Sequence, residues 1–570
     1  MILSWLRQKF QTDYPDTQSD ISIPPDPKLG DYSSNIAFIQ AKKEMKSPME
    51  VGRYIVARLQ ASQEAQSMFE RIEIVPPGFI NLYIKPAYLR RQLANIHAQG
   101  ARYGRGTVGN GQTVILEYSS PNIAKPMHVG HLRNTMIGDA LARIHEALGY
   151  TVLRWNYLGD WGTQFGKLIV AYKRWGKRDV ITAAPIATLL ELYVKFHEEL
   201  KINPELEEAA QREFKKLEDG DVENKELWEW FRKVSLDEFN RLYARLGVRF
   251  DVVDGESNYE KDLQPLIQSL KKRGLIQESN GAFIFDLASY NLPPALVQKT
   301  DGASLYFTRE IVTLQKRLER YHPAKILYVV GNEQSLHFQQ LFAVAQLLNL
   351  TSAEVTHVKY GLVLGSAGQK MATREGRIIP AEEVINKAVH LAKKLVQEKN
   401  PALSSEEKDS VAESVGIGAL KYNDLMEHRN SDIVFDWDRM LDFSGNSGPY
   451  LQYTYARLAS IRRKAGGSLL RRFFSPDLSV LSHDVEVRIM RKLLDFPEMV
   501  RRSAELYVTN NLALYIYELA NEVNRYYESV RILDDSEKPY RDARVFLLES
   551  TMTVLKNGLE LLGIKTLERI

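Results

Sequence analysis

The chain has 570 residues, 44% hydrophobic and 26% charged, which excludes a largely disordered or collagen-like protein and predicts roughly four domains. Its net charge of +3 is too mild to indicate a nucleic-acid partner unless basic residues cluster locally. Because the sequence has no cysteine and no long apolar run, we exclude disulfides, thiolate zinc sites and membrane spans, and we expect a cytoplasmic protein with no membrane partner.

The first hundred residues predict a small α+β unit. Residues 1–7 indicate an amphipathic helix and lack the features of a signal peptide. Apolar residues at helical spacing between 36 and 59 predict helices, whereas 72–75 and 79–84 read as strands around a Pro-Pro-Gly turn. Several glycines follow from Gly104 onward and mark a linker, so we place the first domain at residues 1–105.

The next stretch predicts a β-α-β unit. Val114–Tyr118 and Val152–Trp155 read as strands. Helical spacing runs between them from Val129 to Leu148, and Gly149 stands where a helix-ending glycine belongs. This pattern implies parallel strands joined by a right-handed crossover. Two later segments read as further strands, Lys325–Val330 and Val358–Leu364.

Two long segments read as helical. The charged stretch at about 175–290 looks like an insertion, and the pattern from 381 to the end keeps an apolar face through Leu512, Ile516 and Leu519. The sequence therefore predicts a multidomain α/β protein. We expect domains at 1–105, 106–380 and 381–570.

The sharpest motif is a pair of histidines three residues apart at the start of a predicted helix. His128 and His131 stand on one side of the first turn, where free N–H groups and the helix dipole attract phosphate. Gly130 leaves room for a flat group, and imidazoles can donate to phosphate oxygens. Taken alone, such a pair is more often structural. The motif consists of Asn122, Ile123, Ala124, Lys125, Pro126, Met127, His128, Val129, Gly130 and His131.

A second motif, Lys370–Gly376, follows the strand that ends at Leu364. A basic loop facing the histidines could hold a leaving pyrophosphate, although alone it also fits a solvated surface turn.

Together the two motifs resemble the paired signatures of class I aminoacyl-tRNA synthetases, and further blocks are similar to the arginyl-tRNA synthetase family. The matching blocks cover nearly the whole chain: Asp31–Asn35, Gly78–Asn81, Tyr157–Gly166, Leu217–Asp221, Asp301–Arg309 and Gly448–Arg457. The resemblance implies a Rossmann-like parallel-sheet catalytic domain with a helical insertion, an N-terminal α+β tRNA-binding domain and a helical anticodon-binding domain. It also implies an arginine–tRNA ligase that forms arginyl-adenylate from arginine and ATP and then charges the 3′-terminal adenosine of the tRNA, releasing AMP and pyrophosphate.

By this resemblance, five residues bind ATP: His128, Gly130, His131, Lys370 and Met371. The histidines contact the phosphates, and Lys370 steadies the pyrophosphate. Many class I enzymes carry a second lysine where this chain has Thr373. Our hypothesis is that Lys125 supplies the missing charge. We expect magnesium only as the counter-ion of ATP, and neither a metal site nor a prosthetic group on the protein.

A guanidinium has five donors and no acceptor, so its pocket needs carboxylates. Family matching assigns arginine binding to Glu117, Ser120, Asn122, Tyr306, Glu310 and Gln334. Such a pocket discriminates well without proofreading, so we expect the insertion to be structural or to contact tRNA rather than to edit.

Three departures from the family pattern leave alternatives open. Glu310 replaces the usual aspartate, Ala372 a serine, and Glu375 a common lysine. These changes would fit a catalytically weak RNA-binding paralogue. Two further alternatives are a class I ligase for another amino acid and a small nucleotidyltransferase. A ligase for a substrate without a guanidinium would not need Glu117, and a small nucleotidyltransferase would not need 570 residues with a helical tail. The expected partners are the tRNA for arginine, L-arginine and ATP. The tRNA would meet arginine clusters and tyrosines of the C-terminal third, and we expect a monomer.

Overall fold

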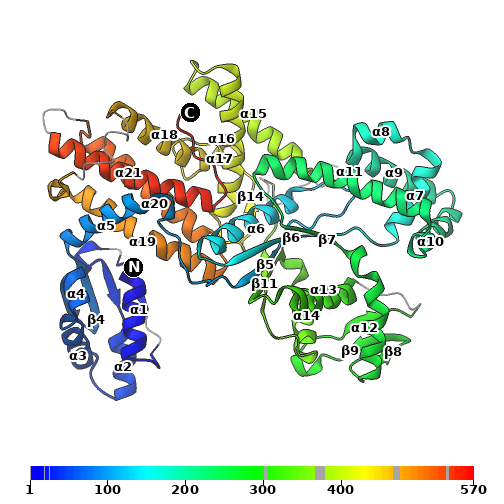
Figure 1. Cartoon of the computed structure of the whole chain (residues 1–570), viewed down its shortest axis with the longest axis horizontal. Coiled ribbons are helices and arrows are strands. Elements are labelled where there is room, and N and C mark those ends of the chain that lie inside the picture. The colour runs from blue at the N-terminus through cyan, green and yellow to red at the C-terminus, as the bar shows by residue number, and fades with distance from the viewer. Residues whose placement is uncertain are drawn as a thin grey trace.

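The computed structural model of the chain describes residues 2–17, 20–24, 26–300, 306–365, 379–466, 476–533 and 538–570. An N-terminal unit and a helical insertion lie at opposite ends of an elongated molecule, with a parallel sheet between them (Figure 1). The C-terminal helices lie above this sheet in the same view. Among the described residues, no helix is long and apolar enough to cross a membrane.

The N-terminal unit is an antiparallel sheet packed against helices. Its strands are β1 (Ile21–Ser22), β2 (Tyr32–Ser34), β3 (Phe69–Val75) and β4 (Phe79–Ile84), in the order β1-β2-β4-β3. Its helices are α1 (Ile2–Asp13), α2 (Ile36–Glu44), α3 (Pro48–Gln60) and α4 (Gln63–Met68), and α5 (Pro86–Gln99) leads out of it. Buried Ile55, Ile72 and Leu82 hold the helices on the sheet, as the alternating apolar pattern predicts.

The central sheet has five parallel strands. They are β5 (Thr113–Glu117), β6 (Thr151–Leu158), β7 (Val252–Gly255), β11 (Lys325–Gly331) and β12 (Glu354–Tyr360), in the order β12-β11-β5-β6-β7. Helix α6 (Val129–Ala147) connects β5 to β6 and packs on the face that carries Leu116, whereas α13 (Tyr306–Tyr321) and α14 (Ser335–Leu347) pack with Ile115 on the other face. The predicted β-α-β unit is thus present, and Gly149 has a φ of 85° just after α6.

The predicted insertion is interrupted by a strand of the central sheet. Helices lie between β6 and β7: α7 (Gln164–Trp175), α8 (Arg178–Ala183), α9 (Pro185–Leu200), α10 (Glu205–Glu218) and α11 (Val222–Leu246). After β7 come α12 (Glu260–Lys272) and a small antiparallel sheet of β8 (Gln277–Ser279), β9 (Ala282–Phe285) and β10 (Ala295–Gln298). The range of about 175–290 that we expected to be an insertion is thus mostly helical, and it also contains β7, which pairs with β6 in the central sheet.

The C-terminal part is almost entirely helical. It contains α15 (Ala381–Lys399), α16 (Ser405–Leu425), α17 (Trp437–Met440), α18 (Gly448–Lys464), α19 (Asp484–Leu506), α20 (Asn510–Ser529) and α21 (Lys538–Leu561). Two short strands, β13 (Val363–Leu364) and β14 (Ile433–Val434), pair in parallel and tie it to the central sheet. Arg133 of α6 strengthens this junction, because its guanidinium donates to the carbonyls of Gly361 and Ser431.

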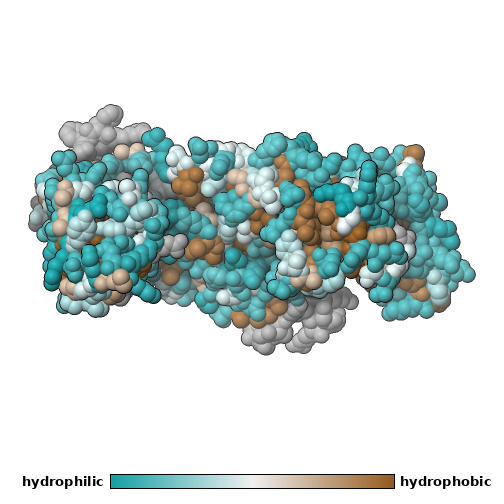
Figure 2. Space-filling model, turned by 90° about the horizontal axis from the view of Figure 1, so that it is seen from below, coloured by the Kyte–Doolittle hydropathy of each residue, from teal (hydrophilic) through white to brown (hydrophobic). Residues whose placement is uncertain are grey.

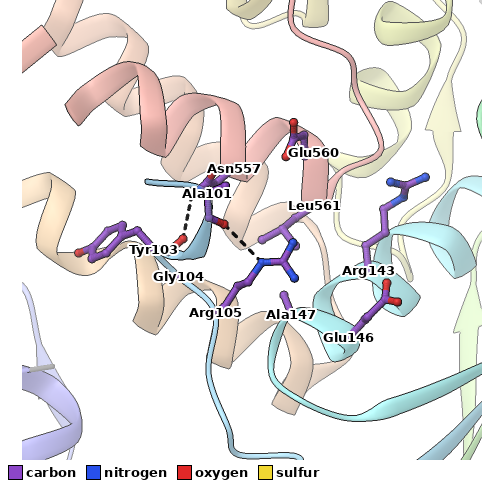
Figure 3. Close-up of a pocket in the computed structure, with 10 residues that line it drawn as sticks. All are labelled: Ala101, Tyr103, Gly104, Arg105, Arg143, Glu146, Ala147, Asn557, Glu560 and Leu561. Atoms are coloured by element: carbon purple, nitrogen blue, oxygen red, sulfur yellow. Dashed lines mark hydrogen bonds between the residues drawn. The ribbon is translucent and has the colours of Figure 1, made fainter. Parts of the chain in front are cut away.

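The linker after α5 runs between α6 and α21 (Figure 3). The Asn557 amide of α21 donates to the carbonyls of Gly100 and Tyr103 at 3.0 and 2.9 Å. A cavity of about 330 Å³ lies here, where Arg105 and Arg143 accompany Glu146. The linker, the end of α6 and α21 line it and none of the predicted site residues does, so we regard it as a feature of domain packing. On the face seen in Figure 2, hydrophobic residues gather between two hydrophilic ends of the molecule.

Candidate active site

A cavity of about 760 Å³ opens at the carboxyl ends of β5 and β11. The chain leaves β5 toward β6 on one side and later returns to β11 on the other, so the connections diverge at this point. Open α/β sheets bind ligands at such a divergence. Most predicted site residues line the cavity: Glu117, Ser120, Asn122, His128, Gly130, His131, Tyr306 and Gln334.

The loop after β5 is held in an unusual backbone conformation. Ser119, Ser120 and Ala124 have positive φ values of 70°, 46° and 60°, which side-chain-bearing residues rarely adopt. The Ser119 N–H donates to the Asn134 side chain at 2.6 Å, and the Ser120 N–H donates to Asn156 at 3.1 Å. Buried amides on α6 and β6 thus fix the loop that carries two of the predicted residues.

The two histidines cap the first turn of α6 and thereby fix their own protonation. His128 Nδ1 accepts from the Gly130 N–H at 3.1 Å, and His131 Nδ1 accepts from the His128 N–H at 3.2 Å. Burial lowers the pKa of His128, and burial together with His128 lowers the pKa of His131 to about 3. Both rings are therefore neutral with the proton on Nε2, and each has an Nε2–H group left to donate.

Three carboxylates gather at the opposite end of the cavity. Glu117 at the end of β5 and Glu256 after β7 line it, whereas Glu310 of α13 lies one layer deeper and is 1% exposed. Apart from the Tyr306 hydroxyl, no donor among the described residues interacts with the oxygens of Glu310. Tyr306, one turn earlier on α13, lines the cavity, and burial and Glu310 raise the pKa of its hydroxyl well above the usual value.

Burial and mutual repulsion raise the pKa of these acids. Burial and the charge of Glu117 raise the pKa of Glu310 to about 8. Burial raises the pKa of Glu256 to about 7, with Asp160 adding to the rise and Arg309 opposing it. Burial also raises the pKa of Glu117, and Arg317 opposes that rise. A cluster of this kind favours a bound cation, which would let the acids ionise.

Lys125, Lys370 and Met371 belong to the predicted site as well. Lys125 does not line the cavity. Its ammonium instead lies 5.4 Å from the centroid of the Tyr193 ring on α9. Lys370 and Met371 lie outside the described residues, as do Ala372, Thr373 and Glu375.

Sequence reasoning missed Glu256 and Arg317. Glu256 was hidden because β7, which positions it, has only four residues in a segment interpreted as helical. Arg317 lies seven residues after Glu310, two turns along the same face of α13, and this spacing was an available signal.

Among the residues that the structure describes, no three histidine, aspartate or glutamate side chains are grouped to hold a metal.

Family models match most of the chain. Residues 92–437 match the class I (R) tRNA synthetase catalytic domain, 451–570 the DALR anticodon binding domain and 2–84 the arginyl tRNA synthetase N terminal domain. The arginine–tRNA ligase of Halothermothrix orenii is 42% identical, and that of Streptococcus suis 44%; each alignment covers 96% of this chain and 95% of the relative.

Solved structures show the same architecture over the whole length. Arginyl-tRNA synthetase from Thermus thermophilus superposes with a TM-score of 0.83 at 25% identity, covering 99% of this chain and 98% of that one. The Plasmodium falciparum enzyme gives 0.81 at 26% identity, covering 100% and 98%.

Proposed function

The chain belongs to the arginyl-tRNA synthetase family of class I aminoacyl-tRNA synthetases, and from this premise we propose that it is an arginine–tRNA ligase acting at the cavity between β5 and β11. The carboxylate of L-arginine attacks the α-phosphorus of ATP, which gives arginyl-adenylate and pyrophosphate. The 3′-terminal adenosine of the tRNA then takes the arginyl group, and AMP leaves. Both steps depend on positioned groups and charge stabilisation.

The observation that carries this proposal is the state of Glu310. Its carboxylate is buried, it interacts with no donor among the described residues except the Tyr306 hydroxyl, and Glu117 adds a second negative charge close by. Buried carboxylates without partners are costly, so a ligand with several N–H donors fits this position. A guanidinium entering past Glu117 and Tyr306 supplies those donors, and Glu256 adds a further acid at the cavity wall.

The α-amino and carboxylate end of arginine would lie nearer the loop after β5. We assign contacts with this end to Ser120, Asn122 and Gln334, all of which line the cavity. The Asn122 side chain is held against the backbone of Gly159, where an added Cβ would lie 1.8 Å from its oxygen. The missing side chain at Gly159 therefore leaves the space that the Asn122 side chain occupies.

We assign ATP to the start of α6. The Nε2–H groups of His128 and His131 donate to phosphate oxygens, and Gly130 lets adenine or ribose approach the backbone. ATP arrives as its magnesium complex. Lys370 and Met371 retain their proposed roles at the pyrophosphate and the nucleotide. In our proposal, the Lys125 ammonium moves away from the Tyr193 ring and supplies the positive charge that Thr373 cannot provide.

We place tRNA on the C-terminal helices and infer that the enzyme works as a monomer in the cytoplasm. A cleft of about 1050 Å³ between α15, α17 and α18 contains aromatic rings and cations. The Arg457 guanidinium lies 5.0 Å from the Tyr453 ring centroid and 5.4 Å from that of Tyr527. Such stacked cation–aromatic surfaces suit unstacked bases. The insertion then has a structural or tRNA-contacting role without editing.

Charging of total tRNA with each proteinogenic amino acid in turn tests the proposed function. We expect ester formation with arginine and none with lysine, because lysine lacks the planar donors that the acids require. ATP–pyrophosphate exchange with arginine and tRNA separates an active ligase from a weak RNA-binding paralogue. Charging of lysine at a rate similar to arginine would contradict the proposal.

Arginine binding is expected to strengthen by about fivefold between pH 7 and pH 8, because the acid must be ionised to hold the cation. In the empty pocket the pKa of Glu310 is about 8, raised by burial and Glu117, with Arg317 and Tyr306 opposing and Glu256 adding to the rise. Below this pKa the carboxyl is protonated, so affinity falls as the pH falls and binding releases a proton. Titration calorimetry in two buffers of different ionisation enthalpy measures this release. A flat affinity with no proton release would show that Glu310 does not titrate with binding.

A further inference from the structure

Arg317 is a fully buried guanidinium directly behind the proposed arginine pocket. Its Nη2 lies 2.5 Å from Glu117 Oε2, and both side chains are nearly inaccessible. The guanidinium carbon lies 4.5 Å from the Trp155 ring centroid and 5.6 and 5.7 Å from those of Tyr157 and Tyr328. Three rings and an ion pair thus hold a permanent cation in place.

Arg317 is a fixed part of the wall rather than an occupant of the cavity. It is 0% exposed and does not line the cavity, whereas its partner Glu117 does. None of its three nitrogens makes a hydrogen bond of good geometry with a described residue, so the ion pair with Glu117 and the surrounding rings hold it. The rings around Arg317 are buried on the α13 side of the sheet, so movement of the Arg317 side chain into the cavity would disrupt the packing of this layer.

The three acids differ in their supply of cations. Glu117 has Arg317. Glu256 faces Arg309, whose guanidinium also pairs with Glu260 at 3.0 Å. Among the described residues Glu310 has no ion pair of its own, and the charged groups that act on its pKa are Glu117, Arg317 and Glu256. The pocket therefore lacks one cation, and the place where it is lacking is Glu310.

Building on the proposed function, we propose that Arg317 is a positioning residue for substrate specificity: it neutralises Glu117 from behind the cavity and leaves Glu310 as the acid that takes the substrate's guanidinium. Glu117 then orients the ligand by hydrogen bonding without adding net charge. Without Arg317, Glu117 would stay buried and unpaired and would compete with Glu310 for the substrate. Without Glu117, the stranded cation would repel arginine.

The test is a charge-balance cycle on the full-length protein. Arginine affinity is measured by titration calorimetry at pH 8, with and without tRNA, for Glu117→Gln, Arg317→Met and the double variant. We expect Glu117→Gln to weaken binding by on the order of 100-fold, since a buried positive charge then faces the substrate's cation. The double variant should bind at least about tenfold more tightly than Glu117→Gln, because removing Arg317 removes that repulsion. The KM for ATP should stay unchanged in each case.

Two further variants keep the test decisive if Arg317→Met does not fold. Arg317→Lys keeps the charge and should bind arginine within about tenfold of the unchanged protein. Arg320→Met, one turn further along α13 and exposed, is the matched control and should bind as before. If the double variant binds arginine no better than Glu117→Gln, the proposed charge balance is wrong. If the unaltered protein does not bind arginine at all, the proposed function itself is wrong.

Discussion

Replacing Glu310 by glutamine raises the KM for arginine by an expected 100- to 1,000-fold, with little effect on the KM for ATP. The substitution keeps the shape of the side chain but removes the charge that the guanidinium must meet in a buried site. Losing one partner of a buried, hydrogen-bonded ion pair costs about 2–5 kcal/mol, which corresponds to this range. Steady-state charging at varied arginine and fixed saturating ATP measures the effect.

Two variants on the same helix serve as controls for this prediction. Glu310→Asp restores the residue that is usual in the family and shortens the arm by roughly 1.5 Å, so we expect its KM to stay within about tenfold of the starting value. Glu319→Gln removes an exposed charge about two and a half turns further along α13 and should have no effect. If Glu310→Gln charges arginine with an unchanged KM, the guanidinium lies elsewhere in the cavity.

The sequence predicted the parts of the fold whose signals are long and periodic. The strand Val114–Tyr118, the helix that follows and the histidines at its start appear as expected, because a buried strand and an amphipathic helix each repeat their pattern over several turns or residues. By contrast, β7 has four residues, of which Val252 is partly exposed and Val253 is exposed, so its pattern is too short to be recognised.

Contacts between distant segments could not be predicted from patterns at all. The Tyr32 hydroxyl donates to Asp495 at 2.9 Å, although the two residues are 463 positions apart. A tyrosine in a strand and an aspartate in a helix are each compatible with a solvated surface, and only packing of the N-terminal sheet against α19 makes them a partly buried pair. Burial raises the pKa of Asp495 to about 7, which sequence reasoning cannot anticipate.

In the candidate site, too, some residues could be predicted from sequence motifs and others only from the packing of distant segments. Family matching found most of the residues that we propose for the site and that line the cavity, because they lie in motifs that can be read from the sequence, but it did not find Glu256. Arg317 was missed because an arginine within a charged helix is normally solvent-exposed. Its burial depends on three rings, Trp155, Tyr157 and Tyr328, which come from two strands far apart in the sequence.

The second large effect is expected at the histidine pair. Replacing His128 or His131 by asparagine should lower the rate of ATP–pyrophosphate exchange by about 100- to 1,000-fold while the KM for arginine stays nearly constant. In each ring Nδ1 accepts a backbone N–H of the first helical turn, and the Nε2–H group remains for phosphate. The asparagine side-chain oxygen can replace Nδ1 as the acceptor, but its amide does not reach as far as Nε2. The change therefore removes the proposed catalytic donor and keeps the helix cap.

Alanine at the same positions separates catalysis from folding. His128→Ala should lose both the donor and the cap, so its melting temperature should fall, whereas that of His128→Asn should not, since loss of a cap costs about 1 kcal/mol. The rate should also show no histidine titration between about pH 7 and pH 9, because burial lowers both pKa values below the usual value for histidine and the rings stay neutral in this range. A rate that falls as a group with a pKa near 6.5 loses its proton would mean that a charged imidazolium, rather than a neutral Nε2–H donor, stabilises the phosphates.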